Sequence, residues 1–219
     1  MLEDIQCVKR YLSGPIYFIR GNHEDFDWLH GKSAATESSI VPIDPVQLFQ
    51  YVKDGTVLHT DGHQIAFLGG VESGKVEAKA IDIAAYEKLL KLAAGEIDVL
   101  VTHDAPYGIN VNFHGEIQGS IQITRLIEQL QPRYHIAGHY HHMNGPRRYG
   151  KTTYLGLNVL VNLREGEQRR IQPGSLAVLD TTKNRLDFVD DDWLSGFNKD
   201  FDFHAFVQQM MQTKNLSHP

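Results

Sequence analysis

The stretch Gly21-Asn22-His23-Glu24 follows the apolar run of residues 16–19 after one arginine. Two more polar clusters are placed in the same way: residues 102–106 follow the run 97–101, and residues 138–142 follow the run 134–137. Each run is too short for a helix and is typical of a buried strand. If the three strands are parallel neighbours, their carboxyl ends share one edge of the sheet, where open α/β sheets build their sites. This arrangement would bring together the side chains of Asn22, His23, His103, His139 and His141.

Bulk properties bound the class of protein. A length of 219 residues is enough for one substantial domain with its own core. The net charge of −6 excludes a surface that clamps nucleic acid as a whole. Cys7 is the one cysteine, so no intrachain disulfide can form, and we expect a cytoplasmic protein. No apolar run reaches about 18 residues, and the charged start Met1-Leu2-Glu3-Asp4 is unlike a signal peptide, so we expect no membrane association.

A helical pattern precedes each of the three apolar runs. Residues 2–12, 80–94 and 120–131 carry apolar residues at helical spacing, and each segment leads into one run. A repeated order of helix and strand is typical of crossover units on a mainly parallel sheet. The sequence therefore predicts an α/β fold.

Most of the remaining elements are expected to be antiparallel strands. The dipeptide Asp61-Gly62 between two strand-like segments indicates a hairpin. The region after His142 predicts strands with no helices between them, whereas residues 25–46 are expected to form an irregular surface loop. The expected strands are residues 56–60, 63–68, 152–161, 175–180 and 185–190.

The last part of the chain, residues 191–219, is rich in aromatic residues and holds a predicted helix at 202–213. We expect it to be a helical extension that packs on a domain formed by residues 1–190. A surface for a partner protein is the alternative. No internal repeat or low-complexity linker divides the chain.

The residue types of the clusters favour a transition-metal site. Asparagine and histidine together suit Mn, Fe or Zn better than Ca or Mg. His139 and His141 are two residues apart, so in extended backbone both reach the same site while Tyr140 points away. Asn22 offers a neutral oxygen to a cation, and His23 beside it is a candidate proton donor to a leaving alkoxide. Each cluster alone is also typical of an ordinary turn; the three in this order are specific.

Taken together, the clusters resemble the third, fourth and fifth motifs of the calcineurin-like metallophosphoesterase superfamily. The matching residues are Gly21-Asn22-His23-Glu24, His103 and Gly138-His139-Tyr140-His141. The resemblance covers roughly residues 1–190 and implies a two-layer β-sandwich flanked by helices, with a two-metal centre at the strand ends. The implied activity is hydrolysis of a phosphomonoester or phosphodiester by a metal-activated water.

The resemblance also implies a role for each matched residue. Asn22, His103 and His139 would bind the second metal, His141 would bind the first, and His23 would be the acid at the phosphoryl group. The implied ions are Mn, Fe or Zn, and the implied partner is a phosphate-ester substrate, with nucleic acid entering only as a candidate substrate. The His-Asp-Ala-Pro form of residues 103–106 is similar to lariat-debranching-like members and points toward phosphodiesters.

Two motifs of the superfamily, Asp-x-His and Gly-Asp, have no counterpart before Gly21. They supply the carboxylate that bridges the metals, so we expect little or no activity from this chain alone. The simplest hypothesis is that Met1 is an internal methionine of a longer enzyme whose first strands are missing here. The second is an impaired scaffold or protein-interaction module that binds at most one metal. The third is replacement of the lost carboxylates by nearby acidic residues, which are Glu24, Asp25, Asp27 and Asp104.

Glu24 and Asp104 stand directly beside motif residues, and we expect them to orient those residues rather than to bind metal. Arg147, Arg148 and Lys151 form a basic segment after the third cluster. Arginine matches phosphate oxygens well, so a contact with the substrate phosphate is one hypothesis and a solvated hairpin tip is the other.

Overall fold

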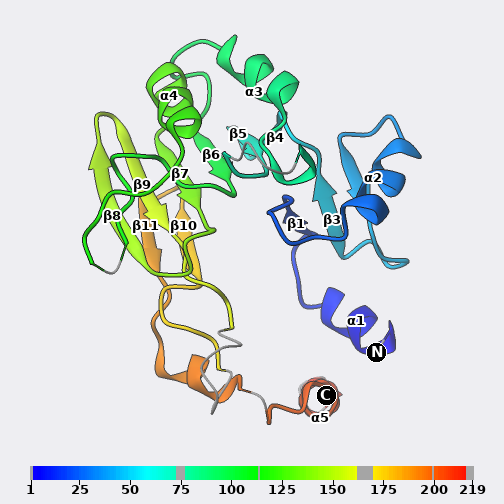
Figure 1. The fold of residues 1–219 in the computed structure, drawn as a ribbon. Coiled ribbons are helices and arrows are strands. Elements are labelled where there is room, and N and C mark those ends of the chain that lie inside the picture. The colour runs from blue at the N-terminus through cyan, green and yellow to red at the C-terminus, as the bar shows by residue number, and fades with distance from the viewer. Residues whose placement is uncertain (1, 73–76, 113, 162–169, 199, 216–219) are drawn as a thin grey trace.

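The largest unit of the computed structural model, which describes residues 2–72, 77–112, 114–161, 170–198 and 200–215, is a six-stranded sheet (Figure 1). The strand order is β4-β5-β6-β7-β9-β8, with β5, β6, β7 and β9 parallel and with antiparallel strands at both edges. The six strands are β4 (Thr56–Thr60), β5 (His63–Leu68), β6 (Val99–Thr102), β7 (Tyr134–Ala137), β8 (Asn144–Tyr149) and β9 (Thr152–Gly156).

Helices α3 (Ile83–Leu90) and α4 (Ile121–Leu130) cross between the parallel strands and cover one face of this sheet. Each begins at a side chain, Asp82 or Ser120, that accepts a backbone hydrogen bond from the first turn. The apolar stripe of each helix is buried against the sheet, which is the main source of its stability. This core includes Leu68, Leu89, Leu100, Leu126, Ile127, Leu130 and Ala137.

The opposite face is covered by the antiparallel pair β10 (Ala177–Asp180) and β11 (Arg185–Phe188). Leu186 of this pair packs with Val99 and Tyr134 of the large sheet. Strand residues therefore alternate between a helix-covered face and a sheet-covered face, as the pleat requires. The α/β fold class with sheets packed in layers and flanked by helices is confirmed, and the second layer among the described residues is a two-stranded hairpin.

The three polar clusters of the sequence, residues 21–24, 102–106 and 138–142, are called the first, second and third motifs in chain order. A separate three-stranded sheet carries the first motif. Its order is β1-β3-β2, formed by β1 (Ile16–Phe18), β3 (Phe49–Val52) and β2 (Ile40–Pro42), with β1 parallel to β3. The prediction that β1 is a neighbour of β6 and β7 is wrong, because its backbone pairs with residues 49–51 instead. The end of β1 still reaches the large sheet, where the Gly70 N–H donates to the Arg20 carbonyl at 3.2 Å.

Other predicted elements differ in detail. The expected loop at 25–46 contains helix α2 (Phe26–Ala34) and strand β2, and Asp25 starts the helix by accepting a hydrogen bond from Trp28 N–H at 3.1 Å. The helix buries only Leu29, so it has no apolar stripe that a sequence pattern could detect. Strand β8 was not predicted, because a proline and two arginines on an edge strand do not alternate with apolar residues.

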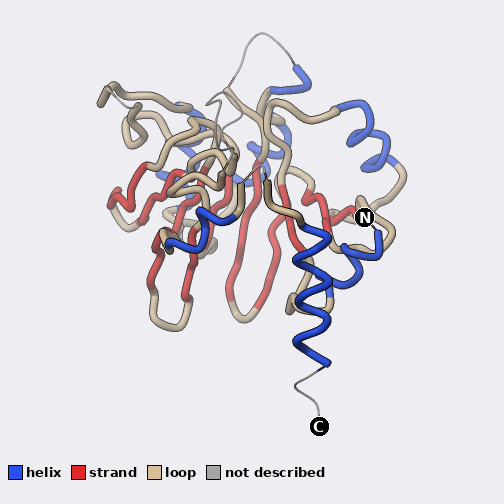
Figure 2. Tube along the Cα trace, turned by 90° about the horizontal axis from the view of Figure 1, so that it is seen from below, coloured by secondary structure: helices blue, strands red, loops and turns tan. Residues whose placement is uncertain are grey.

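The two ends of the described chain pack together. Helix α5 (Phe203–Asn215), which follows the turn η2 (Asp192–Gly196), contacts α1 (Leu2–Lys9), and Figure 2 shows α5 leading to the C-terminus. The His204 Nδ1 and Asp4 Oδ1 atoms are 2.9 Å apart. The proposed domain boundary at residue 190 stays a prediction. Within the described residues, no helix has the length and apolar content needed to cross a membrane.

Candidate functional site

The carboxyl ends of three strands deliver the predicted site residues. Asn22 and His23 follow β1, His103 follows β6, and His139 and His141 follow β7. The backbone of His103 is bonded on both sides, because its N–H donates to Leu68 O at 3.1 Å and its carbonyl accepts from Gly138 N–H at 3.2 Å. The ends of β5, β6 and β7 therefore form one continuous hydrogen-bonded edge beneath the histidines.

The closest contact in the cluster joins the first and second motifs. The His103 Nε2 and Asn22 Oδ1 atoms lie 3.1 Å apart, although the two residues come from different sheets. Gly21 makes this approach possible, since a Cβ atom at that position would stand 2.6 Å from His103 Cε1. Glycine is thus required here for the space that the His103 ring occupies, and not for its backbone angle.

The third motif joins the cluster through His139. Its ring centroid is 5.1 Å from that of His103. The extended geometry expected for residues 139–141 is wrong, because His139 and His141 both have left-handed backbone, with φ of 68° and 56°. Non-glycine residues in this region are uncommon and concentrate at functional sites. The expectation that Tyr140 points away from the histidines is also wrong, because its ring meets the His139 ring edge-on at a centroid distance of 4.8 Å while it packs against the helix-covered core.

The histidines lie within one electrostatic field. Burial and the nearby His139, His141 and His23 together lower the pKa of His103 to about 4, against an opposing effect of Glu24. Burial likewise lowers the pKa of His139, with His141 and His23 adding to the effect and Asp104 opposing it. His103 and His139 are therefore neutral at pH 7, the form in which an imidazole nitrogen can bind a metal ion.

Two acidic side chains beside the motifs bind backbone groups. Glu24 accepts hydrogen bonds from the N–H groups of Gly21 at 2.7 Å and His23 at 3.1 Å, which closes the turn around Asn22. This is the geometry expected of a residue that orients its neighbours.

Asp104 is buried on the other side of the cluster. It accepts from the N–H groups of Ala105 and Glu72, each at 2.9 Å, and from the Tyr140 hydroxyl. Burial raises the pKa of the Asp104 carboxyl against these hydrogen bonds. Of the other acidic candidates, Asp25 caps α2 and Asp27 lies on a cleft described below. Within the described part of the chain, no group of three His, Cys, Asp or Glu side chains has an arrangement that could hold a metal ion.

The basic segment lies away from the histidines. Arg148 pairs with Thr153, which in turn pairs with Tyr134 at the amino end of β7, whereas the histidines follow its carboxyl end. Arg147 and Arg148 are adjacent in β8, so their side chains point to opposite faces of the sheet. Lys151 is exposed in the turn between β8 and β9. The structure therefore does not bring Arg147, Arg148 and Lys151 to the cluster.

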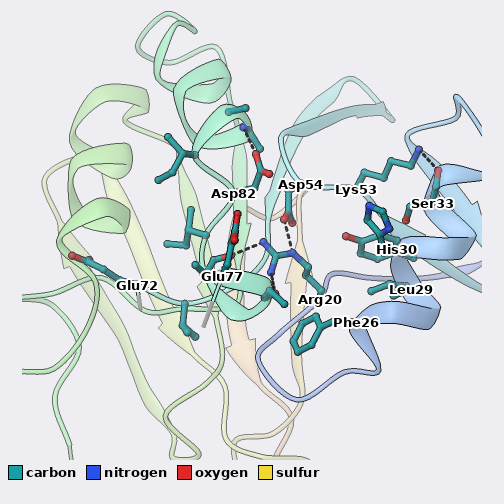
Figure 3. Close-up of a pocket in the computed structure, with 18 of the residues that line it drawn as sticks. Arg20, Phe26, Leu29, His30, Ser33, Lys53, Asp54, Glu72, Glu77 and Asp82 are labelled. Carbon is teal, nitrogen blue, oxygen red and sulfur yellow. Dashed lines mark hydrogen bonds and ion pairs between the residues drawn. The ribbon is translucent and has the colours of Figure 1, made fainter. Parts of the chain in front are cut away.

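Sequence reasoning missed Arg20, which fixes the first motif to the rest of the protein. Its guanidinium pairs with Asp54 at 2.6 Å and donates to the carbonyls of Ala78 and Ala80, in the segment that contains η1 (Glu77–Lys79). Figure 3 shows this side chain at a cleft of about 1220 Å³ between α2 and α3. The sequence signal that could have identified Arg20 is a charged residue directly after an apolar strand. The histidines of the cluster do not line this cleft.

Comparison with known proteins gives partial matches to curated relatives. The chain is 31% identical over 83 residues to UPF0046 protein K07C11.7 and 33% identical over 95 residues to CWF19-like protein 1 homolog, both of Caenorhabditis elegans. These matches cover 38% and 39% of the chain but only 28% and 18% of the relatives. The chain thus spans less than a third of the length of either relative.

Two solved structures match most of the chain at low sequence identity. TT1561 of Thermus thermophilus matches 80% of this chain and 72% of its own, at 16% identity and a TM-score of 0.48. A second solved structure covers 85% of this chain and 70% of its own, at 13% identity and a TM-score of 0.56. The family model described as calcineurin-like phosphoesterase matches residues 1–143, which include all five residues of the cluster. The chain therefore belongs to the calcineurin-like phosphoesterase family.

Proposed function

We propose that the cluster of Asn22, His23, His103, His139 and His141 serves metal-dependent hydrolysis of a phosphate ester. The observation that carries this proposal is the contact between Asn22 Oδ1 and His103 Nε2, with the His139 ring beside them. Asn22, His103 and His139 supply three neutral donors from the ends of three strands. Clusters of such groups at strand ends are characteristic of functional sites.

The spacing of one pair of donor atoms fits a divalent transition-metal ion. Two donors bound to one ion at about 2.1 Å and at right angles stand roughly 3 Å apart, and Asn22 Oδ1 and His103 Nε2 are 3.1 Å apart. An amide oxygen with imidazole nitrogens suits Mn, Fe or Zn. Asn22, His103 and His139 would hold such an ion. His141 would be a further histidine ligand beside them. When bound, the ion supplies positive charge that attracts a phosphate ester and polarises its phosphorus–oxygen bonds.

The protein's own groups have separate tasks in this proposal. The Asn22 carboxamide is held by Glu24 through the backbone of its turn, and His103 is held by the sheet backbone on both sides. The exposed His23 ring stands next to Asn22, where a ring N–H can give its proton to the departing alkoxide oxygen. In a monoester or a diester, water would form the new bond to phosphorus while the bond to the alkoxide oxygen breaks and that oxygen takes the proton, so the proposal covers both substrate classes.

The test combines metal content with hydrolysis. The full chain is loaded with Mn²⁺, desalted, and assayed by elemental analysis and with p-nitrophenyl phosphate and bis(p-nitrophenyl) phosphate. We expect at least one bound ion per chain and metal-dependent release of nitrophenol. His103→Ala should abolish both, whereas His30→Ala, on the exposed surface of α2, should change neither.

His23→Ala separates proton donation from binding. It should retain the ion but lower kcat about 100-fold on an ester with an alkoxide leaving group. The loss should be much smaller on a nitrophenyl ester, whose leaving group is a weak base. Equal losses on both kinds of ester would remove His23 from the role of acid.

A catalytically impaired scaffold or interaction module is the second candidate. The donor set favours it, because the described carboxylates near the cluster are bonded to protein groups. A neutral donor set binds a divalent ion less strongly than one with carboxylates. Wild-type protein with neither bound Mn²⁺ nor hydrolysis would support this second candidate and contradict the first.

A further inference from the structure

His135 is a fully buried polar residue in the middle of β7. It has 0% exposure and lies beside the ring of Tyr154, at a centroid distance of 5.4 Å. Its Nε2 is 2.8 Å from Thr102 Oγ1, on the neighbouring strand. We infer that His135 is a positioning residue that holds His103 against Asn22 by way of Thr102. The expected effect of His135 on metal binding rests on the proposed function, whereas its effect on the position of the His103 ring does not.

Counting protons fixes the direction of the hydrogen bonds. The Thr102 hydroxyl has one proton, and it donates that proton to the Asp104 carbonyl at 2.6 Å. His135 must therefore donate its Nε2–H to Thr102 Oγ1. Burial lowers the pKa of His135 to about 3, so the ring is neutral and its Nδ1 carries no proton.

The Nδ1 atom of His135 has no hydrogen-bond partner among the described residues. A buried polar atom without a partner destabilises the folded state, and an apolar side chain of similar size would avoid that loss. The neighbours of His135 on this face of the sheet belong to the apolar core. Packing alone therefore does not account for a histidine at position 135, whereas the hydrogen bond that its ring donates to Thr102 does.

That bond acts on the turn that carries His103. The Thr102 side chain bridges over His103 to the Asp104 carbonyl, and His135 fixes the rotamer in which the hydroxyl does so. The same turn delivers the His103 ring to Asn22 Oδ1 at 3.1 Å. His135, Thr102 and His103 thus form one chain of contacts from the core to the cluster.

The experiment compares three variants of the full protein. His135→Leu removes the donor, Thr102→Val removes the hydroxyl at nearly constant shape, and His135→Gln keeps a donor nitrogen. Ile136→Val, on the opposite face of β7, is the control for a change in packing alone. The first readout is Mn²⁺ affinity, and the second is the His103 Cε1–H resonance in metal-free protein.

We expect His135→Leu and Thr102→Val each to weaken Mn²⁺ binding about tenfold, the lower end of what partners of metal ligands contribute. A variant that combines His135→Leu with Thr102→Val should lose no more Mn²⁺ affinity than either single variant, since both changes act through one chain of contacts. His135→Gln and the Ile136→Val control should bind like wild type. The melting temperature of His135→Leu should equal or exceed that of wild type, which separates positioning from stability.

The metal-free readout keeps the inference testable if the protein binds no ion. His135→Leu should shift the His103 Cε1–H resonance, whereas His135→Gln and Ile136→Val should not. A wild-type His135 protonated on Nδ1, seen in a long-range ¹H–¹⁵N spectrum, would overturn the inference. An unshifted His103 resonance in His135→Leu would overturn it as well. Absence of Mn²⁺ from wild type, with the resonance shifted as expected, would contradict the proposed function alone.

Discussion

The two halves of the candidate site are held by different kinds of interaction. His103 and His139 stand on the central strands of the large sheet, where backbone hydrogen bonds link Leu68, His103 and Gly138. Asn22 stands on a turn after a three-residue strand of the small sheet, and side chains hold that turn. Any residue except proline can donate a backbone bond, whereas the bonds that hold this turn come from the side chains of Glu24 and Arg20. The position of the first motif therefore depends on the side chains of two particular residues.

Arg20→Ala should break this half most severely. It leaves the Asp54 carboxylate, whose side chain is 9% exposed, without its cation, and it frees the carbonyls of Ala78 and Ala80. Breaking a buried ion pair in this way costs about 3–4 kcal/mol. Urea unfolding measures the loss. The exposed pair of Arg185 and Asp187 is the control, and Arg185→Ala should cost less than about 1 kcal/mol.

Gly21→Ala should separate the two halves without unfolding either. The new Cβ meets the end of the His103 side chain, which can turn away, so the free energy of unfolding should change little. The turned ring leaves Asn22, and Mn²⁺ affinity should fall about 100-fold. Gly14→Ala is the matched control, because a Cβ there would meet nothing within 4 Å. Wild-type affinity in Gly21→Ala would mean that the two halves do not bind one ion together.

The central strands of the large sheet should make the stability of the fold sensitive to acid. Because burial lowers the pKa of His135 to about 3, the unfolded chain binds a proton between pH 3 and 6.5 that the folded chain does not. The free energy of unfolding is therefore not reduced by this proton above pH 6.5. It falls as the pH drops, by about 2 kcal/mol between pH 7 and pH 5. His135→Leu should lack this share of the loss, as urea unfolding at both pH values can show. Identical losses in the variant and wild type would contradict the assignment.

Removing the basic segment should have the smallest effect. Arg147 and Arg148 point to opposite faces of the sheet and lie away from the histidines, so the double change of both residues to alanine should leave KM unchanged within about twofold. A clear rise in KM for a long substrate, with an unchanged value for p-nitrophenyl phosphate, would show that the segment contacts a remote part of the substrate.

The sequence predicted the convergence of the site better than the sheets that produce it. His103 and His139 meet because both follow buried neighbouring strands of one sheet. Asn22 joins them from another sheet, and the prediction of a buried strand before it is wrong, because Ile16 and Tyr17 of β1 are exposed. The position of β1 in a second sheet was not predictable, since its three residues pair with a strand more than 30 positions away. Pairing between distant strands depends on tertiary packing rather than on local pattern.

The backbone of the third motif also escaped prediction. Spacing alone favoured extended geometry for His139 and His141, but both are left-handed, which only the folded turn can impose. Helix α4 shows the opposite case: Ser120 and a complete apolar stripe specify it locally, and the structure has it at Ile121–Leu130. Local chemistry was therefore readable, whereas long-range pairing and strained backbone were not.

The contact between Asp4 and His204 has a consequence for the order in which the chain is made. The two residues are 200 positions apart, so α1 leaves the ribosome long before α5 exists. At ordinary rates of synthesis this interval is about 10–40 s. During that time α1 has no α5 to contact. Asp4, which is buried in the folded chain, therefore lacks its His204 partner until α5 has been synthesised.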